Sequence, residues 1–236
     1  GATAVTLVPA MAADAAKVTM LQRSPTYIVS VPGEDAIANW LRRTIGERRA
    51  YALVRWKNVG LQSFFYRLSR RRPKLMRSVI RRGVVRALPP GYDVDTHFNP
   101  RYNPWDQRVC LVPDSDLFKV LTDGSAEIVT DTIESFDEGG IQLASGRHLD
   151  ADVVVTATGL NLLFLGGAKL TVDGEEVDVA HRFTYKGMML SGVPNVVFTI
   201  GYTNASWTLK ADLVAEYTCR LLDHMQARGY EVCAPE

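Results

Sequence analysis

Two groups of residues near the start of the chain are suited to holding a phosphorylated cofactor. The run GATA at residues 1–4 opens a predicted helix, and a helix N-terminus presents free N–H groups to an anion. A predicted strand follows at 17–22, and Arg23 and Ser24 come directly after it. In a dinucleotide-binding fold, a basic group after the second strand favours a 2′-phosphate over a free ribose hydroxyl. A small-residue helix and a strand without any ligand would give the same local pattern.

Other residue types that often do chemistry lack the required spacing. The four histidines are far apart and no HxxxH or CxxC pattern occurs, so no metal site is predicted. Ser24 and Ser206 lack the G-x-S-x-G context of a serine hydrolase. The three cysteines are too few and too scattered for a disulfide framework. They indicate a reducing compartment, so we expect a cytoplasmic protein in which Cys110 is a buried structural thiol.

Charge is distributed unevenly along the chain. Residues 42–86 carry fifteen Lys or Arg and one acidic residue, Glu47, whereas the rest of the chain carries 12 basic and 25 acidic residues. Trp40, Tyr51, Trp56 and other aromatic residues are interleaved with the basic ones. Amphipathic surface helices explain this pattern most simply. Peripheral contact with an anionic membrane is a second interpretation. No nucleic-acid-binding motif accompanies the charge, so no nucleic-acid partner is expected.

Length and composition indicate a folded globular protein. The 236 residues are 47% apolar and 22% charged, which provides a core and excludes a disordered or fibrous chain. No apolar run reaches the roughly 20 residues that a membrane-spanning helix needs, and no signal peptide opens the sequence.

Helices and strands are predicted to alternate, which indicates an α/β fold class. Helices are expected at residues 2–13 and 206–226, and two or three more are expected within 34–86. A short helix is expected to begin at a cap at Asp114 or Ser115 and to end at Leu121. Strands are expected at 17–22, 126–129 and 132–136, and in a hairpin of 141–143 and 147–149. The apolar runs at 152–157 and 195–200 predict strands buried on both faces of a parallel sheet. Residues 92–113 are predicted to form a long loop.

Several long runs between Gly1 and about Met225 resemble one protein family. The runs are GATAVTLVPAMA, VTMLQRSPTYIVS, RWKNV, LPPGYDV, YNPWDQRVCLVP, DVVVTATGLNL, YKGMMLSGVPN and GYTNASWTLKADLV. They are similar to the C-terminal half of group B flavin-containing monooxygenases of the Baeyer–Villiger type. The resemblance implies a Rossmann-like flavoprotein fold that binds two dinucleotides, truncated at its N-terminus and carrying an inserted basic helical region.

The resemblance also implies a division into domains. Residues 1–156 would be the remainder of an NADPH-binding domain, with a helical insertion at about 34–88, and residues 157–236 would return to the FAD-binding domain. The first strand of the NADPH domain, the family fingerprint and the FAD glycine motif are absent from the sequence. The missing N-terminal FAD-binding half is the expected partner, and the chain alone is expected to be inactive and to bind NADPH poorly.

The resemblance assigns contacts with NADPH to two stretches of the chain. The pyrophosphate-binding residues would be Gly1, Ala2, Thr3 and Ala4. Arg23 and Ser24 would bind the 2′-phosphate, for which the planar fork of an arginine is suited because it donates two hydrogen bonds at once. Gln107 also lies at this cofactor, but many relatives have a lysine there, so Arg23 would carry more of the selectivity.

Arg108 matches the active-site arginine of the family and is the predicted catalytic residue. In the chemistry that the family implies, reduced flavin and oxygen form a negatively charged peroxide, and a fixed cation stabilises that charge. The same cation would stabilise the oxyanion that forms when the peroxide attacks a ketone. A second interpretation pairs this arginine with Asp106 or Asp114.

Two further stretches are implied to contact FAD. Thr158 and Gly159 close the run where the family chain returns to the FAD domain, and a simple strand-terminal turn is the alternative. Asn204, Trp207 and Thr208 lie at the start of the last helix, whose N-terminus would face the flavin. Trp207 is equally suited to packing in a core.

The resemblance implies an enzyme that uses NADPH, FAD and O2. It would insert one oxygen atom into a ketone, or oxidise a sulfur or nitrogen centre, through a flavin peroxide. Two alternatives stay open. One is an NADPH-dependent flavin reductase without oxygenation, a class in which a redox cysteine pair is common and none is visible here. The other is a non-enzymatic basic module that binds an anionic surface through residues 42–86.

Overall fold

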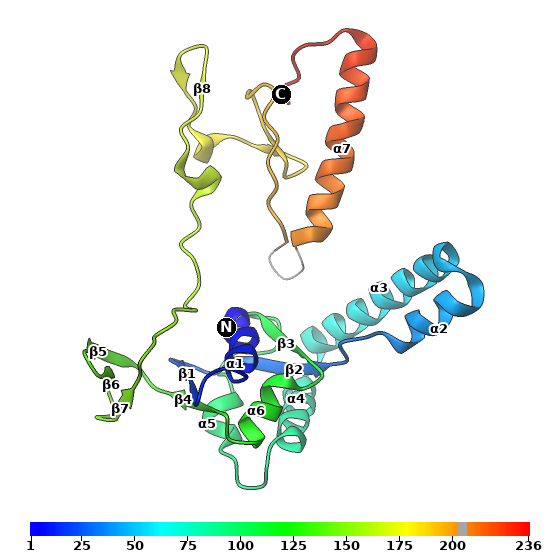
Figure 1. The fold of residues 1–236 in the computed structure, drawn as a ribbon. Coiled ribbons are helices and arrows are strands. Elements are labelled where there is room, and N and C mark those ends of the chain that lie inside the picture. Colours follow the sequence, from blue (N-terminus) through cyan, green and yellow to red (C-terminus); the bar gives the residue numbers. More distant parts are fainter. Residues whose placement is uncertain (203–206) are drawn as a thin grey trace. The chain divides into compact units, whose positions relative to one another are not determined.

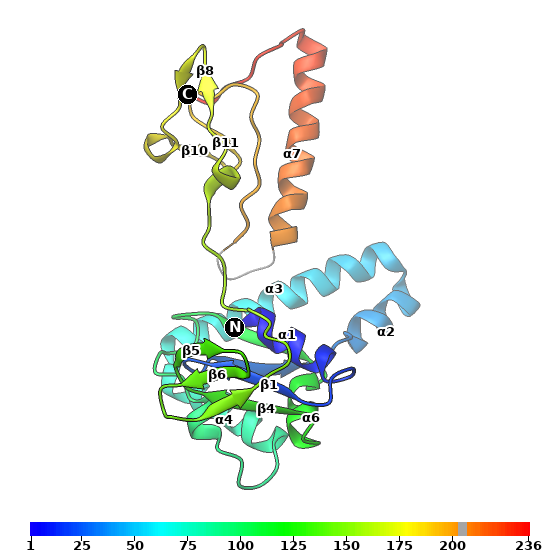
Figure 2. The same ribbon diagram turned by 60° about the vertical axis from the view of Figure 1, so that its left-hand side comes forward.

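The computed structural model describes residues 1–202 and 207–236. The chain divides into two compact units, Gly1–Gly159 and Leu160–Glu236 (Figures 1 and 2). Within the described residues, no helix combines the length and the apolar character that crossing a membrane requires.

The first unit is built around two pairs of parallel strands. β1 (Val18–Gln22) pairs with β4 (Ala126–Thr130), and β2 (Tyr27–Val31) pairs with β3 (Val109–Pro113). Helix α6 (Asp116–Thr122) links β3 to β4. Helix α1 (Ala2–Met11) packs against β1, β3 and α6. The α/β class predicted from the alternation of helices and strands is confirmed.

An apolar core holds α1 and α6 against these strands. Val5 and Val8 of α1, Met20 of β1 and Leu117 of α6 are all buried in it. Cys110 of β3 is a free thiol in the same core, as the sequence predicted. The core therefore fixes the helix that starts at Gly1 against the strand that leads to Arg23.

Residues 34–88 contain the basic stretch 42–86 and are called the basic segment below. This segment forms three helices, in agreement with the prediction of two or three. They are α2 (Ala36–Ile45), α3 (Glu47–Arg71) and α4 (Pro73–Ala87). The carboxylate of Asp35 caps α2 by accepting the Ala38 N–H at 3.0 Å. Gly46 separates α2 from α3 with a φ of +79°, a conformation that favours glycine. Pro73 begins α4, where a missing N–H costs nothing.

The prediction of a continuous loop at 92–113 is wrong in part. Helix α5 (Val94–Phe98) and strand β3 both lie within this range. The Asp93 carboxylate accepts the Thr96 N–H at 3.0 Å and caps α5. The two Asn-Pro pairs at 99–100 and 103–104 interrupt the segment, but the apolar residues on either side of them are buried and ordered into elements.

A small antiparallel sheet completes the first unit. It contains β5 (Ile133–Asp137), β6 (Gly140–Leu143) and β7 (His148–Asp150), in that spatial order. The predicted strand at 132–136 and the predicted hairpin at 141–149 are confirmed.

The second unit contains one long helix and several short elements. Helix α7 (Trp207–Arg228) agrees with the helix predicted at 206–226. The short elements are η1 (Phe164–Gly167), β8 (Thr171–Val172), β9 (Glu175–Glu176), η2 (Val179–His181), β10 (Thr184–Tyr185) and β11 (Met189–Leu190). Met188 and Met189 pack against Val214 of α7, and Leu190 packs with Val193 and Phe198.

The two buried parallel strands predicted at 152–157 and 195–200 are both wrong. Neither range forms a strand, and the side chains of Val153 and Val155 are 74% and 50% exposed. Phe198 is buried, although its neighbours are extended chain without a strand partner. An apolar run specifies that a segment should be covered, but a strand also needs a neighbouring backbone edge to pair with. Within the described residues, no strand pairs with either run.

Candidate cofactor and catalytic site

The start of α1 has the features of an anion-binding helix end. Gly1 is the N-cap residue and contributes no capping side chain, and its carbonyl accepts the Val5 N–H at 3.2 Å. Gly1 and Thr3 are exposed, whereas Ala2 and Ala4 are half-buried against the core. The short link 12–17 returns the chain from α1 into β1, so the helix runs back along the strand. The N-terminus of α1 therefore lies at the carboxyl end of β1.

Arg23 and Ser24 lie in the exposed turn that follows β1. Within the described part of the chain, the Arg23 guanidinium has no hydrogen-bond or ion-pair partner, so its positive charge is available. The turn is held at Thr26, whose hydroxyl makes a 2.8 Å hydrogen bond with the Tyr102 hydroxyl. The Thr26 hydroxyl also lies 3.3 Å from the Arg108 carbonyl oxygen, to which it donates. The structure thus brings the turn at 23–26 next to the segment that contains Gln107 and Arg108.

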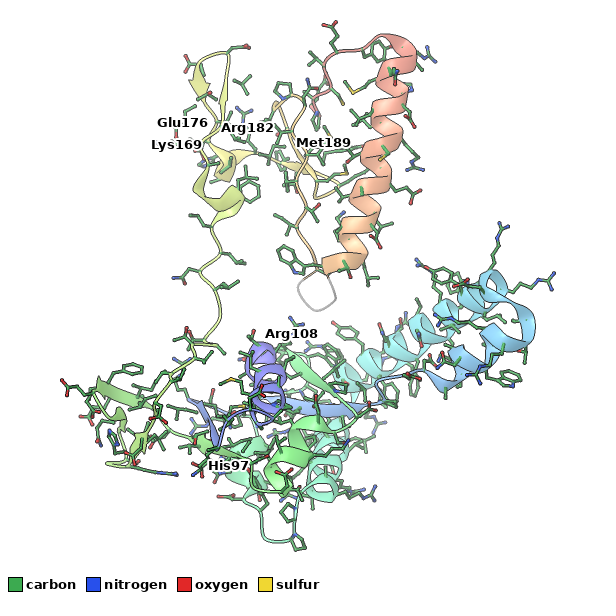
Figure 3. The ribbon with its side chains drawn as sticks, viewed as in Figure 1. His97, Arg108, Lys169, Glu176, Arg182 and Met189 are labelled. Carbon is green, nitrogen blue, oxygen red and sulfur yellow. The ribbon has the colours of Figure 1, made fainter. Side chains whose placement is uncertain are left out.

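Two contacts from Tyr27, the first residue of β2, hold the segment 102–108 in place. The Tyr27 hydroxyl donates to the Tyr102 carbonyl oxygen at 2.7 Å, and the two rings meet edge to face with centroids 5.4 Å apart. Burial raises the pKa of Tyr27, so its hydroxyl remains a donor over the ordinary pH range. Tyr27 is paired in register with Val109, the residue after Arg108. Arg108, labelled in Figure 3, therefore directly precedes β3. The register places it at the same end of the strand pair as Thr26, which directly precedes β2.

The same segment is fixed on its other side by α3. Arg70 forms an ion pair with Asp106, and the Tyr66 ring contacts the Trp105 ring with centroids 6.0 Å apart. The hydrogen bond from Arg70 lowers the pKa of Asp106, and the Asn103 N–H lowers it further. The sequence did not indicate these partners, because Arg70 is one of many arginines in the basic segment.

The expected alternative partners of Arg108 are engaged elsewhere. Asp106 is paired with Arg70, and Asp114 accepts the Gly33 N–H at 2.9 Å. Arg108 and Gln107 are exposed, and the Arg108 guanidinium has no partner among residues 1–202 and 207–236. The structure therefore presents two uncompensated guanidinium groups, from Arg23 and Arg108, on adjoining segments of the first unit.

The remaining predicted contacts lie at the end of the first unit, in the second unit, or outside the described residues. Thr158 and Gly159 are exposed, and Gly159 has a φ of +98°, which suits glycine. Trp207 and Thr208 begin α7, and Asn204 lies outside the described residues. The Trp207 ring lies against the backbone of Gly201, where an added Cβ would come within 2.0 Å of the ring. This packing accounts for a glycine at 201, a residue that the sequence did not single out.

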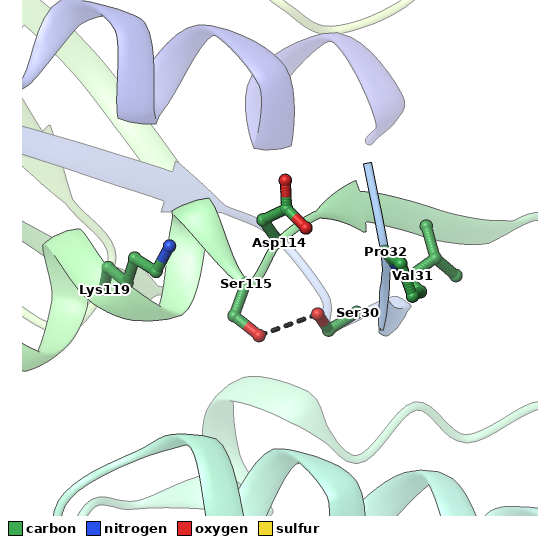
Figure 4. A pocket seen from close by; sticks show the side chains of 6 residues that line it. All are labelled: Ser30, Val31, Pro32, Asp114, Ser115 and Lys119. Carbon is green, nitrogen blue, oxygen red and sulfur yellow. Dashed lines mark hydrogen bonds between the residues drawn. The ribbon is translucent and has the colours of Figure 1, made fainter. Parts of the chain in front are cut away.

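A separate, shallow cavity that is widely open to solvent lies at the opposite end of β2 and β3. It has a volume of about 610 Å³ and is shown in Figure 4. The residues that line it are Ser30, Val31, Pro32, Asp114, Ser115 and Lys119. The hydroxyls of Ser30 and Ser115 are hydrogen-bonded to each other at 2.7 Å. The cavity follows the carboxyl ends of the two strands, whereas Thr26 and Arg108 precede their amino ends.

The histidines are engaged in structural contacts. His97 Nδ1 lies 2.8 Å from the Thr130 hydroxyl, and burial lowers the pKa of this histidine. His148 lies between Asp137 and Asp150, which raise its pKa. In the part of the chain that the structure describes, no group of His, Cys, Asp and Glu side chains could hold a metal ion.

Comparisons with known proteins point to a single group of enzymes. No family model matches the chain. The chain is 57% identical over 237 aligned positions to the FAD-containing monooxygenase EthA of Mycobacterium tuberculosis, covering all of this chain and 48% of that protein. It is 52% identical to the probable FAD-binding monooxygenase AlmA of Acinetobacter baylyi, covering all of this chain and 47% of that protein. The chain thus spans about half the length of the curated relatives it matches.

Solved structures agree on the fold. A crystal structure of OTEMO in complex with FAD and NADP has a TM-score of 0.73 at 18% identity, covering 100% of this chain and 52% of that chain. A steroid monooxygenase bound to NADP has a TM-score of 0.69 at 20% identity, covering 97% of this chain and 52% of that chain. The Rossmann-like α/β fold, present here as about half of the neighbours' chains, is therefore confirmed.

Proposed function

We propose that this chain, which is homologous to the C-terminal half of FAD-containing monooxygenases, works as part of an NADPH- and O2-dependent monooxygenase. The enzyme would insert one oxygen atom into a ketone or oxidise a sulfur or nitrogen centre. The observation that carries this proposal is 57% identity to an FAD-containing monooxygenase across the whole chain. The test is whether one atom of labelled O2 enters the product when NADPH is consumed.

In this proposal, the chain acts together with an N-terminal FAD-binding half of the kind its relatives contain. We refer to the two together as the complete enzyme. The exposed apolar run at 152–157 supports this partner, because Val153, Val154 and Val155 are 74%, 45% and 50% exposed and a paired sheet would cover them. Residues 1–156 would then belong to the NADPH-binding domain, with an insertion at about 34–88, and residues 157–236 to the FAD-binding domain.

The residues at the proposed NADPH site fit a phosphorylated dinucleotide. The first turn of α1, at residues 1–4, would bind the pyrophosphate through its free N–H groups. Arg23 and Ser24 would bind the 2′-phosphate, and the uncompensated charge of Arg23 supports this assignment. Gln107 would contact the same cofactor as a neutral donor. Because Gln107 carries no charge, Arg23 supplies most of the discrimination between NADPH and NADH in this proposal.

FAD, when bound, supplies the electron transfer and oxygen activation of this enzyme class. Arg108 would be the catalytic residue, because a fixed and unpaired guanidinium stabilises negative charge that develops during oxygen transfer. Thr158, Gly159, Asn204, Trp207 and Thr208 would contact FAD. The positive φ and the exposure of Gly159 support a close backbone approach there.

A peripheral membrane contact is a second part of the proposal, from a different observation. Helices α2 and α3 expose large aromatic side chains among their arginines, with Trp40, Tyr51 and Trp56 at 62%, 63% and 73% exposure. Aromatic and basic side chains on one helical hairpin suit the interface of an anionic bilayer. In this proposal, the enzyme works in the cytoplasm and meets the membrane reversibly through this hairpin.

Replacing three exposed basic residues of α3 should weaken binding of the complete enzyme to anionic vesicles. Arg48, Arg49 and Arg67 have no ion pair within the described residues, and each contributes about 1 kcal/mol near such a surface. The triple change to Gln is expected to lower the partition coefficient about 100-fold. Vesicle flotation at low and high salt measures this.

The control changes three exposed basic residues of the second unit, Lys169, Arg220 and Arg228, to Gln. This variant is expected to bind vesicles as the parent enzyme does. Equal binding of the parent to neutral vesicles, or a preference for DNA over vesicles at the same salt concentration, would contradict the membrane contact.

A further inference from the structure

We infer that Arg70 is a positioning residue for Arg108: it holds the Asp106 carboxylate and thereby leaves the Arg108 guanidinium free for an anionic ligand. The inference rests on the proposed function, because it concerns the charge that Arg108 would present to the reaction. It assigns to one residue of the basic segment a role in the active site rather than at a surface.

The turn at residues 103–106 contains Asp106, the ion-pair partner of Arg70, and lies directly before the segment that contains Arg108. One oxygen of the Asp106 carboxylate accepts from Arg70, and the other accepts the Asn103 N–H at 3.2 Å. The Asp106 N–H donates in turn to the Asn103 carbonyl oxygen at 3.0 Å. The turn at 103–106 is thus closed by its own hydrogen bonds and fastened to α3 by the single ion pair of Arg70.

Aromatic packing holds the same turn against α3. Tyr66 lies one helical turn before Arg70, and its ring contacts the ring of Trp105. Trp105 has a φ of +70°, a conformation that costs a non-glycine residue energy and persists only where the surroundings enforce it. The buried Ser69 hydroxyl bonds to the Phe65 carbonyl oxygen at 2.7 Å and completes this contact region of the helix. These contacts fix the turn against α3, so they hold the Asp106 carboxylate opposite Arg70.

The charge of Asp106 explains why Arg70 is needed. Asp106 lies only two residues before Arg108 along the chain, and carboxylates and guanidinium groups readily form paired hydrogen bonds. If Arg70 were absent, Arg108 would be the cation nearest along the chain to the Asp106 carboxylate. A pair between Asp106 and Arg108 would neutralise the charge that the reaction needs. The carbonyl of Arg108 is held separately by Thr26, so the backbone itself would stay in place.

A second ion pair of the same kind provides a matched control. Arg81 of α4 pairs with Asp95 of α5 at 2.9 Å, and its side chain is 49% exposed, the same fraction as that of Arg70. The Arg81 pair also joins a basic helix to a following segment, but it does not touch the turn at 103–106. Removing it tests the general effect of losing one such pair.

The experiment measures kcat and the NADPH KM of the complete enzyme for six variants, each with a thermal unfolding scan. The single variants are Arg70→Gln, Arg70→Lys, Asp106→Asn, Arg81→Gln and Arg108→Ala, and the sixth combines Arg70→Gln with Asp106→Asn. Arg70→Gln is expected to lower kcat about tenfold, because the freed carboxylate pairs with Arg108. The combined variant, which lacks that carboxylate, is expected to recover at least half of the lost kcat. Arg70→Lys keeps a cation at the site and, like Arg81→Gln, should stay within about twofold of the parent.

The rescue separates this inference from a purely structural role of Arg70. If the combined variant is as impaired as Arg70→Gln, the carboxylate is not the cause and the inference is overturned. Unchanged kcat in Arg70→Gln overturns it as well, and in that case an impaired Arg108→Ala variant shows that the proposed function still stands. If Arg108→Ala itself keeps full kcat, both the role of Arg108 and the role of Arg70 are wrong.

Discussion

Replacing Arg108 by alanine in the complete enzyme is expected to lower kcat for oxygen transfer by about 10²- to 10³-fold. The guanidinium lies directly before β3, is exposed, and has no partner within residues 1–202 and 207–236. Removing one preorganised donor of this kind raises the activation free energy by roughly 2.7–4 kcal/mol, because the donor stabilises the negative charge that develops in the transition state. Steady-state kinetics with product detection measures the effect, and Arg108→Lys should retain part of the activity because it keeps the charge but loses the planar fork.

Arg23→Ala is the matched control for this prediction. It removes the second uncompensated guanidinium, but from the proposed 2′-phosphate site. A charge-assisted hydrogen bond is worth about 1.5–3 kcal/mol, so the KM for NADPH should rise about 10- to 100-fold. The KM for NADH, which has no 2′-phosphate, should not change. Because the cofactor phosphate is held equally in the ground and transition states, kcat should change little. An Arg108→Ala variant that alters only the NADPH KM would contradict a catalytic role for Arg108.

Residues 1–236 alone are expected to show no turnover with added FAD and NADPH. The chain spans about half the length of its curated relatives, and its apolar run at 152–157 lacks a strand partner within the described residues. A flavin bound without that partner would lie in an incomplete, solvent-filled site, in which electrostatic stabilisation is weak. The rate of NADPH oxidation in the presence of the chain should equal that of free FAD.

The positive control for that measurement is the same chain produced together with the N-terminal half of the Mycobacterium tuberculosis relative. The pair should bind FAD and oxidise NADPH, because the two sequences are 57% identical where they can be compared. Turnover by residues 1–236 alone, above the free FAD rate, would contradict the need for a second half.

The sequence predicted the elements whose signals are local. The helices of the basic segment were predicted from their amphipathic charge pattern. The structure adds their boundaries, with Asp35 as a cap, Gly46 at a positive φ and Pro73 at a helix start. The antiparallel sheet of β5, β6 and β7 follows from a turn at residues 144–146 between apolar segments. Strand β2 was not predicted, because it is a run of only five residues that directly follows the turn at Pro25.

The two wrong strands have a different cause. The runs at 152–157 and 195–200 have the composition of buried strands, but pairing depends on a neighbour that a single run cannot specify. Val153 is 74% exposed, and no strand among the described residues pairs with its run. Within the described residues, composition therefore predicted both the burial and the strand structure of these two runs incorrectly, with Phe198 as the buried exception.

The sequence indicated residues for the candidate site, whose roles stay predictions, but it did not indicate the side chains that hold their segments in place. Arg23 and Arg108 were identified, and the structure places their segments side by side through Thr26. Arg70 and Tyr66 were not identified, because the ion pair to Asp106 and the contact with Trp105 join segments more than thirty residues apart. Such contacts depend on how α3 returns to the chain after α4, which no local pattern encodes.

The most direct test of the central claim is to follow the oxygen atoms. The complete enzyme is incubated with NADPH, ¹⁸O2 and either a ketone or a sulfide, and the product is analysed by mass spectrometry. The proposed function predicts one ¹⁸O atom in each product molecule and about one NADPH consumed per product formed. NADPH consumption that reduces the flavin without any ¹⁸O in a product, for every substrate class tested, would contradict the monooxygenase and favour a flavin reductase.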